Sequence, residues 1–93
     1  MDLTQTLKGL KIEVENHYNV KMLGLFGSYA KHSEHSDSDL DLLVSYGAGM
    51  SLFDDARLTL LLEERLHRKV DLVDESTLRP EFKSEILSTM IRL

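Results

Sequence analysis

Two short apolar segments that lie close together in the chain constrain the fold most. Residues 21–27 (KMLGLFG) and 39–45 (DLDLLVS) have the length and composition of buried strands, and glycines bound the first. About eleven residues separate them. A parallel pair needs a crossover of roughly a dozen residues or more, usually a helix. We therefore expect these two strands to be antiparallel neighbours.

Helical periodicity surrounds this strand pair. Residues 3–18 place leucines, a valine and a tyrosine at helical spacing, which predicts an amphipathic first helix. Ser51 is a suitable cap for a leucine-rich helix over about 52–67, which we expect to be buried on more than one side. Residues 70–73 predict a third strand. A last helix should begin at Pro80 and carry one apolar stripe to the C-terminus. Its members are Phe82, Ile86, Leu87, Met90 and Ile91.

The order is thus helix, strand, strand, helix, strand, helix. It predicts an α/β (α+β) fold in which a small mixed sheet is flanked by helices. At 93 residues the chain is expected to form one domain, residues 1–93.

Charge and composition limit the classes of function that this chain can have. The formal charge is −5, from 16 acids against 11 lysines and arginines, which argues against direct nucleic-acid binding and against an anionic membrane surface. The absence of cysteine excludes disulfides and thiolate metal sites. No apolar run approaches the roughly 20 residues of a membrane span, and the N-terminus does not resemble a signal peptide. We expect a cytoplasmic protein.

The acids at the start of the second strand are the main chemical feature. Successive strand residues face opposite sides, so Asp39 and Asp41 should share one face while Leu40 and Leu42 share the other. Two anions beside a core repel each other and lose hydration, so at least one pKa should be raised unless a cation is bound. Oxygen ligands suit Mg²⁺, Mn²⁺ or Ca²⁺ better than Zn²⁺. An EF-hand loop is excluded, because Ala48 stands where its final glutamate should be.

Gly27 and Ser28 end the first strand. A glycine there allows close approach of a phosphate or another backbone, and a hydroxyl can donate to phosphate oxygens. Antiparallel pairing would place this end beside Asp39.

This pattern, Gly27-Ser28, ten residues, then Asp39-Leu40-Asp41, resembles the signature of the polymerase-beta-like nucleotidyltransferases. Length, strand order and the Gly-Ser-Tyr-Ala sequence are most similar to the minimal nucleotidyltransferases (MNT) found beside HEPN-domain partners. The resemblance runs over nearly the whole chain and includes a strand with Asp71, which is similar to the strand that carries the family's third carboxylate.

The resemblance implies a nucleotidyltransferase fold and a role for each matching residue. Asp39 and Asp41 would bind two Mg²⁺ ions, with Mn²⁺ as the alternative, and Asp71 would complete one metal site and help activate the attacking hydroxyl. Asp74 and Glu75 lie close enough in sequence to compete with Asp71 for this assignment.

The phosphate-binding residues follow in the same way. Gly27 and Ser28 would hold the β- and γ-phosphates of a nucleoside triphosphate. Lys31 supplies positive charge where the family has arginine, without the bidentate geometry, and His32 replaces a glycine. His32 and His35 are more simply read as loop residues than as metal ligands.

The resemblance implies transfer of AMP from ATP to a hydroxyl, with a tyrosine of a HEPN toxin as the acceptor, so that the chain acts as an antitoxin. We expect either a hetero-oligomer with this partner or a homo-oligomer. Two alternatives stay open. The chain could neutralise a HEPN partner by occlusion without catalysis, or it could modify a small-molecule alcohol.

Overall fold

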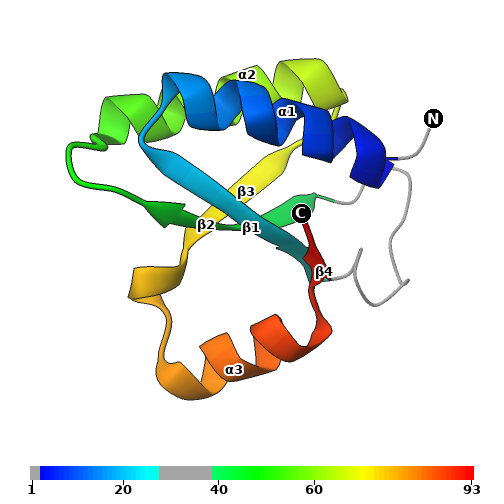
Figure 1. The fold of residues 1–93 in the computed structure, drawn as a ribbon, viewed down its shortest axis with the longest axis vertical. Helices are drawn as coiled ribbons and strands as arrows, with labels where there is room; N and C mark the ends of the chain where they lie inside the picture. Colours follow the sequence, from blue (N-terminus) through cyan, green and yellow to red (C-terminus); the bar gives the residue numbers. More distant parts are fainter. Residues whose placement is uncertain (1–2, 28–38) are drawn as a thin grey trace.

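The computed structural model describes residues 3–27 and 39–93, and in them a mixed sheet is flanked by helices (Figure 1). The elements are α1 (Leu3–His17), β1 (Val20–Phe26), β2 (Leu40–Tyr46), α2 (Leu52–Leu66), β3 (Val70–Asp74), the 3-10 turn η1 (Glu75–Thr77), α3 (Pro80–Thr89) and β4 (Ile91–Arg92). The predicted α/β class and the three predicted helices and strands are confirmed, with bounds that shift by one or two residues.

The sheet has the strand order β3-β2-β1-β4. β1 and β2 are antiparallel, as their short connection predicts, whereas β2 and β3 are parallel and joined through α2. The fourth strand was not expected. Ile91 was predicted to continue the last helix, but it pairs with Leu25 of β1, and the Leu93 amide donates to the Leu23 carbonyl at 3.1 Å. The open edge of β1 offers backbone partners that a further helical turn would not satisfy.

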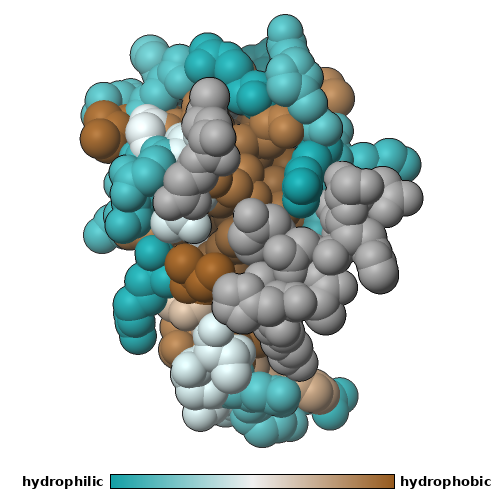
Figure 2. Space-filling view, turned by 90° about the vertical axis from the view of Figure 1, so that its right-hand side faces the viewer, coloured by the Kyte–Doolittle hydropathy of each residue, from teal (hydrophilic) through white to brown (hydrophobic). Residues whose placement is uncertain are grey.

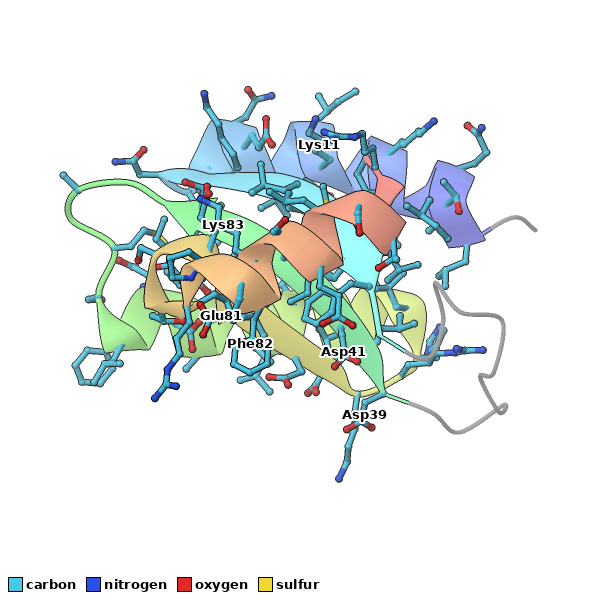
Figure 3. All side chains as sticks on the ribbon, turned by 90° about the horizontal axis from the view of Figure 1, so that it is seen from below. Lys11, Asp39, Asp41, Glu81, Phe82 and Lys83 are labelled. Atoms are coloured by element: carbon cyan, nitrogen blue, oxygen red, sulfur yellow. The ribbon has the colours of Figure 1, made fainter. Side chains whose placement is uncertain are left out.

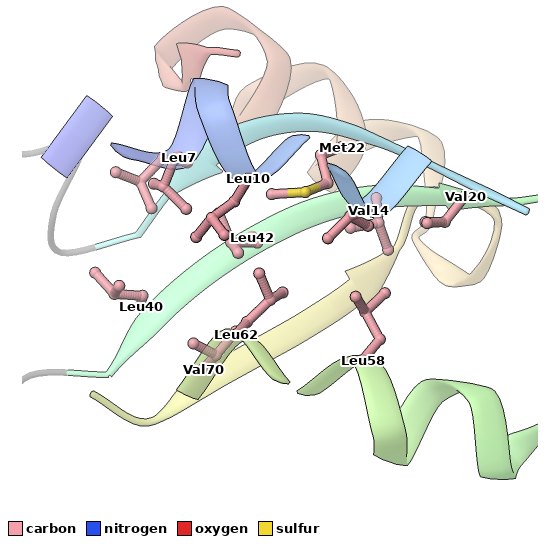
Figure 4. Packing of buried hydrophobic residues seen from close by; sticks show 12 residues of the cluster. Leu7, Leu10, Val14, Val20, Met22, Leu40, Leu42, Leu58, Leu62 and Val70 are labelled. Carbon is pink, nitrogen blue, oxygen red and sulfur yellow. The ribbon is translucent and has the colours of Figure 1, made fainter. Parts of the chain in front are cut away.

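α1 and α2 cover one face of the sheet, and the main core lies between (Figures 1 and 4). Leu40, Leu42 and Val44 of β2 are fully buried on this face, as strand alternation requires. The helices contribute Leu7, Leu10 and Val14 from α1 and Leu58 and Leu62 from α2.

The prediction for α2 was right about its start and wrong about its burial. Ser51 and Asp54 form a capping box, in which the Asp54 amide donates to the Ser51 hydroxyl at 3.1 Å. Only Leu58 and Leu62 are fully buried, while Leu60 is 65% exposed. A single layer of helices leaves the outer side of α2 without a partner among the described residues.

α3 lies on the opposite side of the sheet (Figure 1). None of its residues is fully buried, and Phe82 is 54% exposed, so the predicted stripe packs less deeply than expected. Contacts near both ends of α3 attach it to the rest of the protein. The Lys83 ammonium contacts the Glu75 carboxylate at 2.7 Å. The Met90 sulfur packs so closely on Gly24 that a Cβ placed on this glycine would lie 2.5 Å from it. Among the described helices, none combines the length and the hydropathy needed to cross a membrane.

Candidate active site

Asp41 lies at the centre of the candidate site because β2 is an inner strand. It is opposite Phe26 of β1 on one side and Asp71 of β3 on the other. Leu40 and Leu42 point into the core, so Asp41 faces the α3 side of the sheet, where Figure 3 shows it. The predicted division of the two faces is confirmed for β2.

The parallel pairing of β2 with β3 brings Asp71 beside Asp41. The two residues are in register, and Asp71 is exposed whereas Asp41 is half-buried. Asp39 is exposed and comes immediately before β2 begins, at the same end of the sheet (Figure 3). Asp74 is in register with Val44, three residues further along. The geometry therefore favours Asp71 over Asp74 as the neighbour of the aspartate pair.

Gly27 is held against the Asp41 carboxylate. Its φ is +76°, in the region that favours glycine, and a Cβ placed on it would lie 2.2 Å from Asp41 Oδ2. No side chain larger than hydrogen fits this contact without displacing the carboxylate. The sequence predicts close approach of a phosphate or another backbone at Gly27. Among the described residues, the group that approaches it is instead the Asp41 side chain.

The acids also affect one another. Burial raises the pKa of Asp41, and the negative charges of Asp71 and then Asp39 raise it further. This is the raised pKa that the sequence predicted for anions held together beside a core. An added positive charge at this end of the sheet would be favourable.

The donor chemistry fits a hard divalent cation, since the candidates are carboxylate oxygens on neighbouring strands. The aspartate side chains do not converge on one point: among the residues described, no three histidine or acidic side chains form a group that could hold a metal ion. The backbone thus brings the aspartates to one end of the sheet without closing a coordination sphere.

Several predicted residues cannot be placed. Ser28, Lys31, His32 and His35 lie outside the described residues. Figure 2 shows hydrophobic surface in the middle of one face of the molecule, with hydrophilic residues around it.

One polar contact was not anticipated from the sequence. The Tyr46 hydroxyl, at the far end of β2, donates to the Asp55 carboxylate of α2. The two residues are nine positions apart across a turn, and no spacing rule would pair them.

The chain is similar to known nucleotidyltransferases over most of its length. A family model described as "Polymerase beta, Nucleotidyltransferase" matches residues 8–93. The Thermococcus cleftensis relative named "Protein adenylyltransferase MntA" is 35% identical over 91 residues, which cover 98% of this chain and 88% of the relative. The Methanocaldococcus jannaschii relative named "Putative protein adenylyltransferase MJ0435" is 39% identical over 74 residues, 80% of each chain.

Solved structures have the same fold. "Structure of putative minimal nucleotidyltransferase" superposes with a TM-score of 0.79 at 38% identity and covers 100% of this chain and 97% of that one. "Crystal structure of the toxin-antitoxin with AMP-PNP" gives a TM-score of 0.72 at 23% identity, over 99% of this chain and 72% of that one. The second likeness concerns the fold alone.

Proposed function

Because this chain belongs to the polymerase beta nucleotidyltransferase family, we propose that it transfers AMP from ATP to a hydroxyl group of a partner protein. The finer proposal is that the acceptor is a tyrosine of a HEPN toxin and that the chain serves as its antitoxin. Relatives named as protein adenylyltransferases support a protein acceptor. The fold is shared with a structure titled as a toxin-antitoxin with AMP-PNP, which is what suggests a toxin as the partner to test.

The observation that carries this proposal is the position of Asp41. A half-buried carboxylate lies against Gly27, in register with the carboxylate of Asp71, and its pKa is raised by burial and by its neighbours. Such an arrangement costs stability, because like charges are held together beside a core. Strained or costly local arrangements cluster at functional sites.

Asp39, Asp41 and Asp71 would hold the divalent cations, Mg²⁺ or Mn²⁺. When bound, these ions offset the charge of the triphosphate and of the leaving pyrophosphate. Gly27 and Ser28 would bind phosphate oxygens at the end of β1, and Lys31 would add a positive charge.

The chain's own residues then have separate tasks. Gly27 lets the Asp41 carboxylate lie against the end of β1, where any side chain would collide with it. Asp71 is exposed, so it can face an acceptor that arrives from outside. In the transfer, the acceptor oxygen forms a bond to the α-phosphorus, the bond to pyrophosphate breaks, and the hydroxyl proton passes to the Asp71 carboxylate.

The test uses the chain with a partner protein that co-purifies with it, ATP labelled in its AMP portion, and Mg²⁺. We expect label on the partner with wild type and none with Asp39→Ala plus Asp41→Ala. A matched control, Glu64→Ala plus Glu85→Ala, removes two exposed acids elsewhere and should transfer normally. An unlabelled partner that is inhibited equally by wild type and by the aspartate variant would establish occlusion instead. Label appearing only on a small-molecule alcohol would support the third hypothesis.

A further inference from the structure

An open cavity lies at the opposite end of β2 from the candidate active site. Its volume is about 480 Å³, within the range of roughly 300–1,000 Å³ typical of ligand sites. Tyr46, Asp55 and Asp74 contribute polar groups, and Leu52 and Leu72 contribute apolar surface. Tyr46 is five residues from Asp41 along the strand, or roughly 17 Å. Gly27, Asp39, Asp41 and Asp71, the described residues assigned to nucleotide or metal binding, do not line this cavity.

The described charges around the cavity have one sign. Asp55 and Asp74 come from α2 and from the end of β3, and no described lining residue is basic. Burial, the hydrogen bond to Asp55 and the charges of Asp55 and Asp74 all raise the pKa of Tyr46, so the negative potential extends to the cavity wall. The cavity is therefore suited to a cationic group.

Large apolar side chains adjoin this cavity. Leu52 is 87% exposed and Phe53 is 79% exposed, both in the first turn of α2. Contiguous exposed apolar surface with a polar rim is typical of protein interaction sites. A small organic cation in the cavity would leave both of them in water.

We propose that this cavity binds an arginine side chain of the partner protein, with Leu52 and Phe53 covering apolar residues around that arginine. The guanidinium group can donate to two separate carboxylates at once, and arginine is enriched at the centres of interfaces. This inference rests on the proposed function only in taking the partner to be a protein. It assigns the docking surface to the end of the sheet away from the aspartates that would carry the chemistry.

Charge favours a different protein over a second copy of this chain, because two copies that each carry a net charge of −5 repel. A metal ion fits less well. Two carboxylates from different elements are present, and the described residues include no third acidic or histidine side chain grouped with them.

The first test uses N-acetylarginine N-methylamide as the probe, titrated into the protein and followed by amide chemical shifts. Shifts should change at Tyr46, Asp55 and Asp74. They should not change with N-acetylnorleucine N-methylamide, which lacks the charge. Asp55→Asn plus Asp74→Asn should abolish the response while keeping the fold, because asparagine can still accept from the Tyr46 hydroxyl and cap η1. Equal shifts with both probes, or an unchanged response in the variant, would overturn the proposal.

The second test measures affinity for a partner protein that co-purifies with this chain, without nucleotide. Asp55→Asn plus Asp74→Asn should weaken binding by about tenfold or more, whereas Glu64→Gln plus Glu85→Gln should change it less than about twofold. Equal affinities for the two double variants would contradict the docking site. Weakened binding together with absent AMP transfer in wild type would instead refute the proposed function and leave the docking site standing.

Discussion

At the scale of single residues, the free-energy cost of the candidate site falls on the ionised form of Asp41. Its carboxylate is half-buried, touches the backbone at Gly27 and lies next to another anion at Asp71. Each of these raises the free energy of the ionised form. A strand that served only the fold would be more stable with an apolar or neutral residue at this position.

Substitution of Gly27 tests the contact with Asp41. We expect Gly27→Ala to lower the free energy of unfolding by roughly 2 kcal/mol or more and to reduce transfer activity, because the new methyl group meets the Asp41 carboxylate. The control is Gly49→Ala. Gly49 also has positive φ, +89°, but open space around it, so only the backbone strain of about 1 kcal/mol remains. Urea denaturation compares the two, and equal losses would show that the contact is unimportant.

Removing the charge of Asp41 should separate stability from activity. In metal-free buffer at about pH 7, Asp41→Asn should raise the free energy of unfolding and abolish transfer. The raised pKa means that the Asp41 carboxyl group holds its proton more readily in the folded protein than in the unfolded chain. The destabilisation of the folded state by ionised Asp41 is therefore fully present above the raised pKa, and it fades as the pH falls toward the ordinary pKa of 3.8.

The stability advantage of Asp41→Asn should accordingly shrink between about pH 7 and about pH 4, as measured by urea unfolding at each pH. A variant less stable than wild type at neutral pH, or an advantage that does not vary with pH, would contradict this account.

At the scale of elements, local patterns could be predicted better than pairings between distant segments. The Ser51 cap, the Pro80 start and the alternation of β2 are all properties of a few neighbouring residues, and the structure confirms them. β4 could not be predicted, because its existence depends on the open edge of β1. For α2, a leucine-rich composition did not reveal that one helical layer covers only one of its sides.

The candidate site shows the same limit. The pairing of β1 with β2 follows from a short connection, whereas the register that places Asp71 beside Asp41 depends on how α2 packs across the sheet. Ser28 and Lys31 remain predictions, since they lie outside the described residues.

The attachment of α3 gives a prediction at this scale. Lys83 is hydrogen-bonded to Glu75, and this bond, followed by one from Ser45, lowers the pKa of Glu75. Lys83→Met should lower the free energy of unfolding by about 0.2–1 kcal/mol at neutral pH, as for other partly exposed pairs. The lowered pKa means that this stabilisation is present above the ordinary pKa of 4.5 and is lost as the pH falls through the lowered value.

Urea unfolding of Lys83→Met, with the exposed Lys8→Met as control, tests this attachment. A loss of stability that persists unchanged in acid would mean that Lys83 acts through packing and not through its charge.

At the scale of the whole molecule, the two faces of the sheet have different roles. The face under α1 and α2 holds the main hydrophobic cluster, and the face toward α3, a helix with no fully buried residue, presents Asp41 (Figures 1 and 3). The carboxylates can thus lower the stability of the folded protein without disrupting the packing of the core. The two ends of β2 also differ, with the candidate nucleotide site at its start and the acidic cavity beyond Tyr46 at its end.

The proposed function requires that this chain move the AMP portion of ATP and not the terminal phosphate. The most direct measurement incubates the chain and a co-purified partner protein with Mg²⁺ and ATP labelled either at the α-phosphate or at the γ-phosphate. We expect the α-label to become attached to the partner and the γ-label to leave in pyrophosphate. Attachment of the γ-label, or no transfer of either label, would contradict the proposed function.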